Sequence, residues 1–301
     1  MLTDAQAELH RTGLGGSDGA AILGVHPYRS ALDVYLEKRG LKPPFEGNRF
    51  TRWGNRLEAA VADAYAEETG REVFLPEDAA FAAGVIQEHG VVRHPDHHFI
   101  MGFPDRLVFD KEKGPGVLEC KTTASWNARE WDDAPPLHHQ IQLQHYLLLT
   151  GYQWGSLAVL IGGNDPRFED LPANPAFHEV YVQRLVEFYE RHLREPGVPP
   201  EPDPEKDADN LRFAYRAVAG SIVDLGPEAE ALAERYELIK SQIKTLETEK
   251  KEAETALKVQ IGHHEVARFP SGWGYSWKES QREGYLVAPT TVRTLRRVKK
   301  L

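Results

Sequence analysis

Two short apolar segments that flank a cluster of turn-forming residues constrain this fold more than any other feature of the chain. Residues 103–109 and 116–121 alternate as β-strands do, and the stretch between them is rich in charged residues, glycine and proline. We therefore expect an antiparallel hairpin. If the hairpin is symmetric about Glu112, Leu107 lies opposite Val117.

The same register brings two carboxylates together. Asp105 falls opposite Glu119, and opposed residues of an antiparallel pair have Cβ atoms about 4.5–5.5 Å apart. Strand alternation puts Lys121 on the same face as Glu119. Two carboxylates this close repel each other unless a proton or a cation lies between them, and their oxygens suit Mg²⁺ or Mn²⁺. With Lys121 placed to orient or deprotonate a water molecule, the pattern predicts a hydrolase site.

The alternative is that these charges form an ordinary solvated face of the hairpin. The surroundings argue against it, because Leu107 and Val117 share the charged face while Leu118 and Cys120 point to the other. Charges on an otherwise apolar strand face cost several kcal/mol unless they are compensated. This favours a functional site.

Residues 52–68 are predicted to form a helix, because large apolar residues recur there every four positions. These residues are Trp53, Leu57, Val61 and Tyr65. Glu58 lies beside this stripe, where a helix carboxylate can reach a site at the edge of the core. A third metal contact from Glu58 is one interpretation, and a solvated helix carboxylate is the other.

A second helix is expected between the proline pair 135–136, which can start it, and Gly151, which can stop it. Gln140 shares a helical face with Leu143 and Leu147, and this turns its amide toward the core, where the active site can lie. The competing interpretation is a buried glutamine that satisfies backbone groups.

The N-terminal region contains a candidate anion site. Ser17 is predicted to cap a short helix from Asp18 to Leu23, which Gly24 ends, and backbone N–H groups at a helix start bind anions. With Arg11 nearby, this turn is a candidate pocket for a DNA phosphate. A plain helix cap beside a surface arginine is the alternative.

The bulk composition limits the class of protein. A net charge of −10 argues against a protein that coats DNA electrostatically, although it leaves room for a local basic groove. A single cysteine, Cys120, excludes an internal disulfide framework and suits a reducing cytoplasm. We expect no membrane partner, because no apolar run is long enough to span a bilayer and no signal-peptide stretch is evident. The basic residues 293–300 form either a phosphate-binding strand or a solvated tail.

We expect an α/β fold in three parts. A core covers residues 1–195, a proline-rich linker or crossing covers 196–225, and a C-terminal extension with a helix and a β-hairpin covers 226–301. Within the core, residues 157–161 and 177–182 are predicted to be strands.

The C-terminal extension has a helical pattern of its own. Apolar residues step by four and three along residues 232–246, which suits pairing with another helix, until Lys250 interrupts the stripe and argues against a long coiled coil. Alternating aromatic residues over 266–278 predict a hairpin.

Four short motifs resemble a known family. Pro104-Asp105 followed by Glu119-x-Lys121 resembles the core of the PD-(D/E)XK nuclease superfamily. Three more segments narrow the resemblance to YqaJ-type viral recombinases, relatives of lambda exonuclease. They are Arg11-x-x-x-Gly15-Gly16-Ser17-Asp18 with Pro27-Tyr28, Trp53-Gly54-x-x-x-Glu58, and Gln140-x-Gln142 with Thr150-Gly151. The motifs follow the family's order over residues 11–163, but His138-His139 stands where the family often has an aromatic residue, which leaves the contacts of that helix open.

The resemblance implies a restriction-endonuclease-like core, in which helices flank a central mixed sheet. It also implies a Mg²⁺-dependent deoxyribonuclease that degrades linear double-stranded DNA from a 5′ end. Asp105, Glu119 and the Cys120 carbonyl would hold Mg²⁺, with Mn²⁺ as an alternative, and Glu58 would help to hold a second ion. Lys121 would orient or deprotonate the attacking water.

The resemblance also implies roles for residues outside the hairpin. Gln140 would support the catalytic site, and Arg11 and Ser17 would grip the 5′-phosphate. Double-stranded DNA ends are the expected partner, together with a single-strand annealing protein in phage-type recombination, and a processive enzyme would form a homo-oligomeric ring. The expected location is the cytoplasm, that of a bacterial host if the chain derives from a phage.

Two other functions stay open. A restriction-like or DNA-repair endonuclease of the same superfamily would cut a circular plasmid, whereas an exonuclease would not. A non-catalytic DNA-end-binding recombination protein is expected to lack one of the acidic or lysine positions, and all of them are present here.

Overall fold

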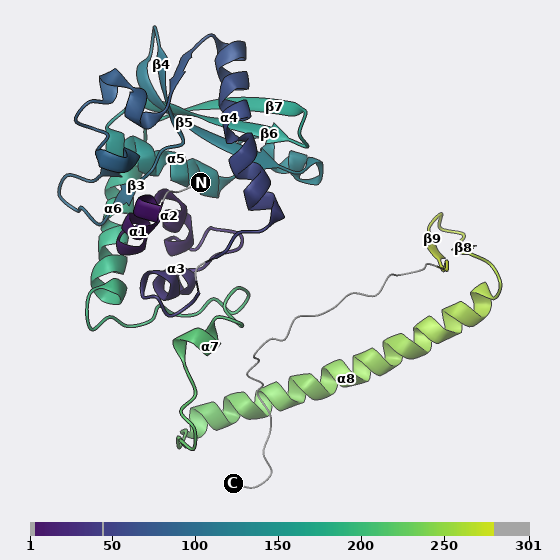
Figure 1. Cartoon of the computed structure of the whole chain (residues 1–301). Coiled ribbons are helices and arrows are strands. Elements are labelled where there is room, and N and C mark those ends of the chain that lie inside the picture. Colours follow the sequence, from purple (N-terminus) through teal and green to yellow (C-terminus); the bar gives the residue numbers. More distant parts are fainter. Residues whose placement is uncertain (1–3, 44, 280–301) are drawn as a thin grey trace. The chain divides into compact units, whose positions relative to one another are not determined.

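The computed structural model describes residues 4–43 and 45–279 of the chain. The chain forms two units, Met1–Arg216 and Ala217–Leu301 (Figure 1). The first unit continues past residue 195, where we expected the core to end. Part of the reason is Asp207, which is buried and accepts a hydrogen bond of 2.6 Å from the hydroxyl of Ser30.

A five-stranded mixed sheet lies at the centre of the first unit, with the strand order β1-β4-β5-β6-β7 (Figure 1). The strands are β1 (Glu72–Phe74), β4 (Arg106–Asp110), β5 (Gly114–Thr123), β6 (Trp154–Ile161) and β7 (Asp165–Pro172). Strands β5 and β6 are parallel, and the other neighbours are antiparallel. The expected mixed sheet is confirmed, as is a strand over residues 157–161.

The hairpin of β4 and β5 has the register that the sequence predicted. Leu107 pairs with Val117, so Asp105, one residue before β4, comes beside Glu119. The turn is fixed locally, because the side chain of Asp110 accepts hydrogen bonds from the two backbone N–H groups that follow Lys111, at 2.8 and 3.0 Å.

Helices α4 (Arg49–Thr69) and α5 (Leu137–Thr150) cover opposite faces of the sheet. Residues of β4, β5 and β6 that point to α4 are Val108, Leu118 and Ala158, and those that point to α5 are Leu107, Val117 and Leu157. Both helices lie where the sequence predicted them, and α5 ends at Gly151, whose left-handed φ of 72° suits glycine. By alternation, Glu119 and Lys121 point to the α5 face.

Three helices precede the sheet: α1 (Asp4–Thr12), α2 (Gly16–Ile22) and α3 (Ala31–Lys38). The start of α2 differs from the prediction. Gly15 is its N-cap residue instead of Ser17, because the buried carboxylate of Asp18 reaches back to accept the Gly15 N–H at 2.9 Å. Lys38, 2.8 Å from Asp18, and Arg29, 3.1 Å away, compensate the buried charge.

Two glycines allow α2 to pack closely against its neighbours. A Cβ atom on Gly16 would lie 3.1 Å from side-chain atoms of Gln142 and Tyr146 on α5. A Cβ atom on Gly19 would lie 1.8 Å from the hydroxyl of Tyr181. Neither position has room for a side chain without movement of the neighbouring helix.

The prediction of a strand at residues 177–182 is wrong, because this segment lies inside helix α6 (Pro175–Phe188). The side chain of Asn174 accepts a hydrogen bond from the Phe177 N–H at 3.1 Å, and Pro175 occupies the first helical position. Its buried residues, Tyr181, Leu185 and Phe188, recur at helical spacing. The apolar residues of this segment suit either a strand or a helix, and the Asn174 cap and Pro175 favour the helix.

The remaining elements of the first unit are short. They are β2 (Val92–Arg93), β3 (Met101–Gly102), the 3-10 turns Pro76–Asp78, Ala80–Ala82, Glu88–Gly90 and Ser125–Trp131, the π-helical turn Tyr189–Leu193 that continues α6, and α7 (Leu211–Ala214). Strands β2 and β3 pair with each other outside the main sheet.

The described part of the second unit, up to residue 279, contains one long helix and a hairpin. Helix α8 (Pro227–Ile261) begins with proline in its first turn, and the hairpin pairs β8 (Val266–Arg268) with β9 (Gly274–Ser276), as predicted. The basic residues 293–300 lie outside the described residues. No helix in the described part of the chain has the length and apolar character to cross a bilayer.

Candidate active site

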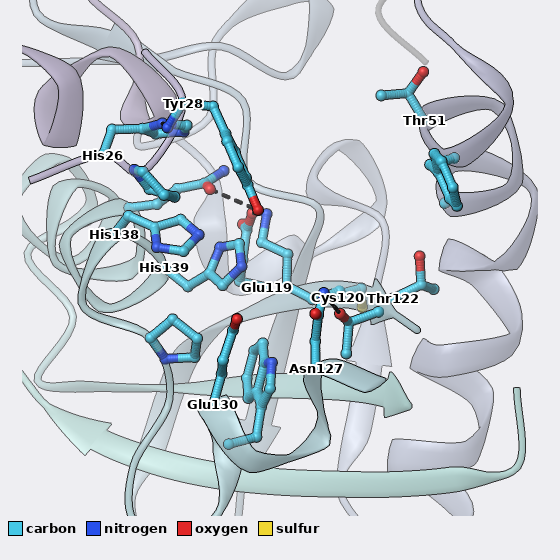
Figure 2. A pocket seen from close by; sticks show the side chains of 18 of the residues that line it. His26, Tyr28, Thr51, Glu119, Cys120, Thr122, Asn127, Glu130, His138 and His139 are labelled. Carbon is cyan, nitrogen blue, oxygen red and sulfur yellow. Dashed lines mark hydrogen bonds and ion pairs between the residues drawn. The ribbon is translucent and has the colours of Figure 1, made fainter. Parts of the chain in front are cut away.

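A cavity of about 920 Å³ opens beside the second half of β5 (Figure 2). Its walls come from β5, from the first turns of α4 and α5, from residues 25–28 and from the turn over 127–131. The first half of the chain therefore supplies most of this cavity, although its walls are far apart in the sequence.

An acidic pair, the buried Glu119 and the half-buried Asp105, lies at the base of the cavity. Glu119 has no exposed surface, and its Oε1 accepts a hydrogen bond of 2.6 Å from the ammonium of Lys121. Its Oε2 is buried and has no hydrogen-bond partner among the described residues. Asp105 accepts a hydrogen bond from the Cys120 N–H at 2.9 Å. An orphaned carboxylate oxygen in a buried position is costly, so this site is incomplete without a further group.

The electrostatics of the pair show the same imbalance. Burial, together with the negative charge of Asp105, raises the pKa of Glu119 to about 8. Burial also raises the pKa of Asp105. Burial acts to lower the pKa of Lys121, but the two carboxylates outweigh it and the pKa is raised, so this ammonium stays charged. One ammonium does not neutralise two carboxylates, and a proton or a cation is needed to complete the balance.

The donor set fits a hard divalent cation, which prefers carboxylate oxygens. Asp105, Glu119 and Cys120 all contribute to the cavity wall, and one carboxylate oxygen there is unpartnered. Within the part of the chain that the structure describes, however, no three histidine, cysteine, aspartate or glutamate side chains form a metal-binding cluster.

Glu58 lines the cavity from α4 but is engaged elsewhere. Its Oε1 accepts a hydrogen bond of 2.7 Å from Arg106, which also donates to the backbone oxygen of Asp105 at 2.5 Å. Glu58, which the sequence offered as a third metal contact, therefore lies near Asp105 and Glu119 but pairs with Arg106.

Gln142, not Gln140, is the glutamine that meets Lys121. The Lys121 ammonium donates to Gln142 Oε1 at 3.0 Å, and Gln142 in turn lies 3.4 Å from the hydroxyl of Tyr146. Gln140 is not part of the cavity wall, and its amide donates to the Pro135 carbonyl at 2.6 Å, closing the first turn of α5. The expected contact of Gln140 with the site is therefore not present in this structure. Two positions along a helix turn a side chain by more than half a turn, so Gln142 faces Lys121 and Gln140 does not.

The structure does not bring Arg11 and Ser17 together as a phosphate pocket. Arg11 is exposed on α1 and pairs with Glu8. Ser17 is half-buried in α2, and its backbone carbonyl accepts a hydrogen bond of 3.3 Å from Arg29. Neither Arg11 nor Ser17 lines the cavity at the acidic pair.

Sequence reasoning assigned no role to a group of histidines on one side of the cavity. Figure 2 shows His26, His138 and His139 there, with Thr51 of α4 on the opposite side. The His138 and His139 rings lie 3.9 Å apart, and His139 stacks on Trp131 at 5.4 Å. Burial lowers the pKa of His139 to about 2 and that of His26 to about 4, so both are neutral near pH 7. The one sequence signal was the histidine pair at the point where the chain departs from the pattern of the family that it resembles.

The start of α4 carries exposed basic and aromatic side chains, of which Phe50 lines the cavity. Phe50 and Trp53 are exposed, with Arg49 4.8 Å over the Phe50 ring and Arg56 5.3 Å over the Trp53 ring. Neither of these arginines, nor Arg52 between them, forms an ion pair with a carboxylate among the described residues. A chain with a net charge of −10 thus presents a local cluster of exposed arginines at the start of α4.

Comparison with known proteins agrees with this fold and these motifs. Residues 7–153 match the YqaJ-like viral recombinase domain. This segment, just under half of the chain, is therefore similar to the YqaJ-like viral recombinase family. The uncharacterized protein YqaJ of Bacillus subtilis strain 168 is 28% identical over 273 residues, which cover 89% of this chain and 81% of that protein.

Several solved structures are similar in part. An alkaline exonuclease from Laribacter hongkongensis has a TM-score of 0.49 and 18% identity, and the similarity covers 62% of this chain and 91% of that one. A phage-related exonuclease from Haemophilus somnus 129PT has a TM-score of 0.41 and 13% identity, covering 59% of this chain and 93% of that one.

Proposed function

We propose that this protein is a metal-dependent deoxyribonuclease that hydrolyses phosphodiester bonds at the ends of linear double-stranded DNA, in the 5′-to-3′ direction. The observation that carries the proposal is the buried Glu119 carboxylate, which lies beside Asp105 and Lys121 in an open cavity and keeps one oxygen without a partner. The exonuclease mode and the polarity follow from the resemblance of the motifs to lambda-type exonucleases.

Mg²⁺ is the proposed cofactor, with Mn²⁺ as an alternative. Asp105 and Glu119 would hold the ion, with the Cys120 carbonyl as a further oxygen ligand, and Glu58 would contribute to a second ion if it releases Arg106. When bound, the metal supplies an activated water and stabilises negative charge on the phosphate.

Lys121 has the central role among the side chains of the chain itself. Hydrogen bonds to Glu119 and Gln142 fix its ammonium at the cavity wall. From there it would orient the attacking water and offset the charge that develops on the phosphate oxygens. Gln142 would keep the ammonium in position, and the neutral His139 would offer hydrogen bonds without adding charge.

The basic and aromatic residues at the start of α4 support a nucleic-acid substrate. Unpaired arginines bind phosphates, and exposed aromatic rings stack on bases. Arg49, Arg52 and Arg56 would hold the DNA backbone outside the cavity, and Phe50, which lines the cavity, would contact the bases as an end enters. This arrangement would let an acidic protein bind DNA at one place instead of over its whole surface.

The decisive test is degradation of a linear duplex labelled at either its 5′ or its 3′ end, with Mg²⁺ and with a chelator. We expect Mg²⁺-dependent release of short products from the 5′ end, no activity with chelator, and no cleavage of a closed circular plasmid. Release from the 3′ end would contradict the polarity, and cutting of the plasmid would indicate an endonuclease. The absence of any cleavage with Mg²⁺ or Mn²⁺ would refute the catalytic proposal.

A further inference from the structure

Helix α8 carries an apolar stripe that the proposed nuclease function does not use. Its large apolar residues alternate in steps of four and three, as in the seam of a coiled coil. They are Leu232, Tyr236, Ile239, Ile243 and Leu246, and they are between 42% and 67% exposed. A stripe this regular on a charged helix is typical of a surface that packs against a second helix.

The charges beside this seam differ between its two halves. Arg235 and Lys240 flank the N-terminal half, whereas Glu247, Glu249 and Glu254 flank the C-terminal half. In a coiled coil, residues at these flanking positions face the corresponding positions of the partner helix and determine its identity and direction. The separation of sign along α8 therefore restricts which helix can pair with it.

A parallel pair of α8 helices is electrostatically unfavourable. In a parallel pair of helices, the residue just before Tyr236, Ile243 or Lys250 lies opposite the partner's residue five positions later. Arg235 would then face the partner's Lys240, and Glu249 would face the partner's Glu254. Both contacts bring like charges together. Reversal of one helix instead brings the basic half opposite the acidic half.

We propose that α8 is a self-association surface, which pairs antiparallel with α8 of a second copy of this chain. The register that matches the seam places Ile239 against the partner's Ile243 and Tyr236 against the partner's Leu246, and it brings Arg235 to the partner's Glu249.

Two lysines fit this register. Lys250 falls opposite the partner's Leu232 near the end of the seam, where its long side chain reaches water. Lys240 lies near its own copy across the two-fold axis, but it already pairs with Glu237 of its own helix at 3.0 Å.

The first test is the mass of the full chain by sedimentation equilibrium over a range of concentrations. We expect a reversible dimer, which Ile243→Glu disrupts by placing a charge at the centre of the seam. Ser241→Glu is the matched control, because position 241 lies on the outer face of the same turn, and it should leave the dimer intact. Both variants add a helix-forming residue at an exposed position, and circular dichroism should show unchanged helix content. A wild-type chain that stays monomeric, or an Ile243→Glu variant that associates as the wild type does, overturns the proposal.

The second test determines the direction of the helices. Arg235→Glu should weaken the antiparallel dimer about fivefold in dissociation constant, because two exposed ion pairs per dimer become repulsive. The double variant with Arg235→Glu and Glu249→Arg should restore the wild-type value. In a parallel dimer, Arg235→Glu would instead face the partner's Lys240 and strengthen association. Such strengthening would refute the antiparallel arrangement.

Discussion

Two clusters of charged side chains on the same five-stranded sheet are balanced in opposite ways. One is the acidic pair with Lys121 at the cavity. The other, which we call the Arg71 cluster, joins Arg71 to Asp110 at the end of β4 and to Asp170 on β7. Both contain two carboxylates and one principal cation, and both are largely shielded from water.

The Arg71 cluster satisfies its charges. The guanidinium donates to Asp110 at 2.8 Å and to both oxygens of Asp170 at 2.8 and 2.7 Å. Burial acts to raise the pKa of Asp170, but hydrogen bonds from Arg71, Lys113 and Ser156 outweigh it and lower the pKa to about 2. The cluster is complete as it stands and ties β1, β4 and β7 together.

The cavity pair lacks this completeness. Its single ammonium reaches one oxygen of Glu119 and leaves the other unpartnered, and the pKa of Glu119 rises to about 8. The difference lies in the cation, since a guanidinium can donate to two carboxylates at once whereas the ammonium of Lys121 is shared with Gln142. With Lys121 as the cation, Glu119 Oε2 has no hydrogen-bond partner among the described residues and is free to accept one from a ligand. The unpaired oxygen lowers the stability of the fold.

The largest expected difference between the clusters concerns cleavage. Lys121→Met should reduce turnover of linear duplex DNA by about a thousandfold while DNA binding persists, because the ammonium proposed to orient the attacking water is lost. Lys111→Met, in the exposed turn of the same hairpin, is the control and should cleave normally. Undiminished cleavage by Lys121→Met would remove this lysine from the mechanism.

The next largest effect concerns stability. Arg71→Met should lower the free energy of unfolding by about 3 kcal/mol, because Asp110 and Asp170 lose their shared partner inside the fold. Chemical denaturation measures this loss. The folded fraction should cleave DNA at nearly the wild-type rate, and a stability equal to that of the wild type would show that the cluster contributes little.

A third expectation concerns how the free energy of unfolding depends on pH, measured in buffer that contains a chelator. Glu119 has a folded-state pKa of about 8 against an ordinary value of 4.5, so the folded protein binds more protons than the unfolded chain between these values. The free energy of unfolding should therefore fall as pH rises through this window. Glu119→Gln should remove that decline and be more stable than the wild type at pH 8.5 by about 2 kcal/mol.

Urea denaturation at several pH values measures this third effect. Addition of Mg²⁺ at pH 8.5 should stabilise the wild type and not Glu119→Gln. A wild-type chain whose stability is flat across the window would contradict the imbalance described for the acidic pair.

The smallest expected effect distinguishes two glutamines on α5. Gln142→Ala should reduce turnover about tenfold, because the Lys121 ammonium loses one of its two fixed partners. Gln140→Ala, two residues away, is the matched control and should stay within twofold of the wild type. Equal effects of the two substitutions would argue against a positioning role for Gln142.

Local signals in the sequence were sufficient for the hairpin and the long helices. The turn after Asp110 and the alternation of Leu107 and Val117 set the register that brings Asp105 to Glu119. Proline and glycine likewise marked the ends of α5. These features depend on residues close together in the chain, where geometry follows from a few backbone angles.

Contacts between distant segments were not predictable in the same way. The pairing of Glu58 with Arg106 joins α4 to β4, and nothing local to either residue indicates it. Gln142 instead of Gln140 faces Lys121 because helical phase is set by how α5 packs on the sheet. Ser17 lost the cap position to Gly15 because the buried Asp18 makes the stronger contact.

The close packing of α2 has a consequence for the chemistry some distance away. A methyl group on Gly19 would collide with the hydroxyl of Tyr181, and that hydroxyl is hydrogen-bonded at 2.9 Å to His145 on the helix that also carries Gln142. A Cβ atom on Gly16 would lie 3.1 Å from the side chain of Gln142. Because Gly16 and Gly19 have no side chains, α2 packs closely against the helices that carry Gln142 and Tyr181, and this spacing helps to set where the Gln142 amide meets the ammonium of Lys121.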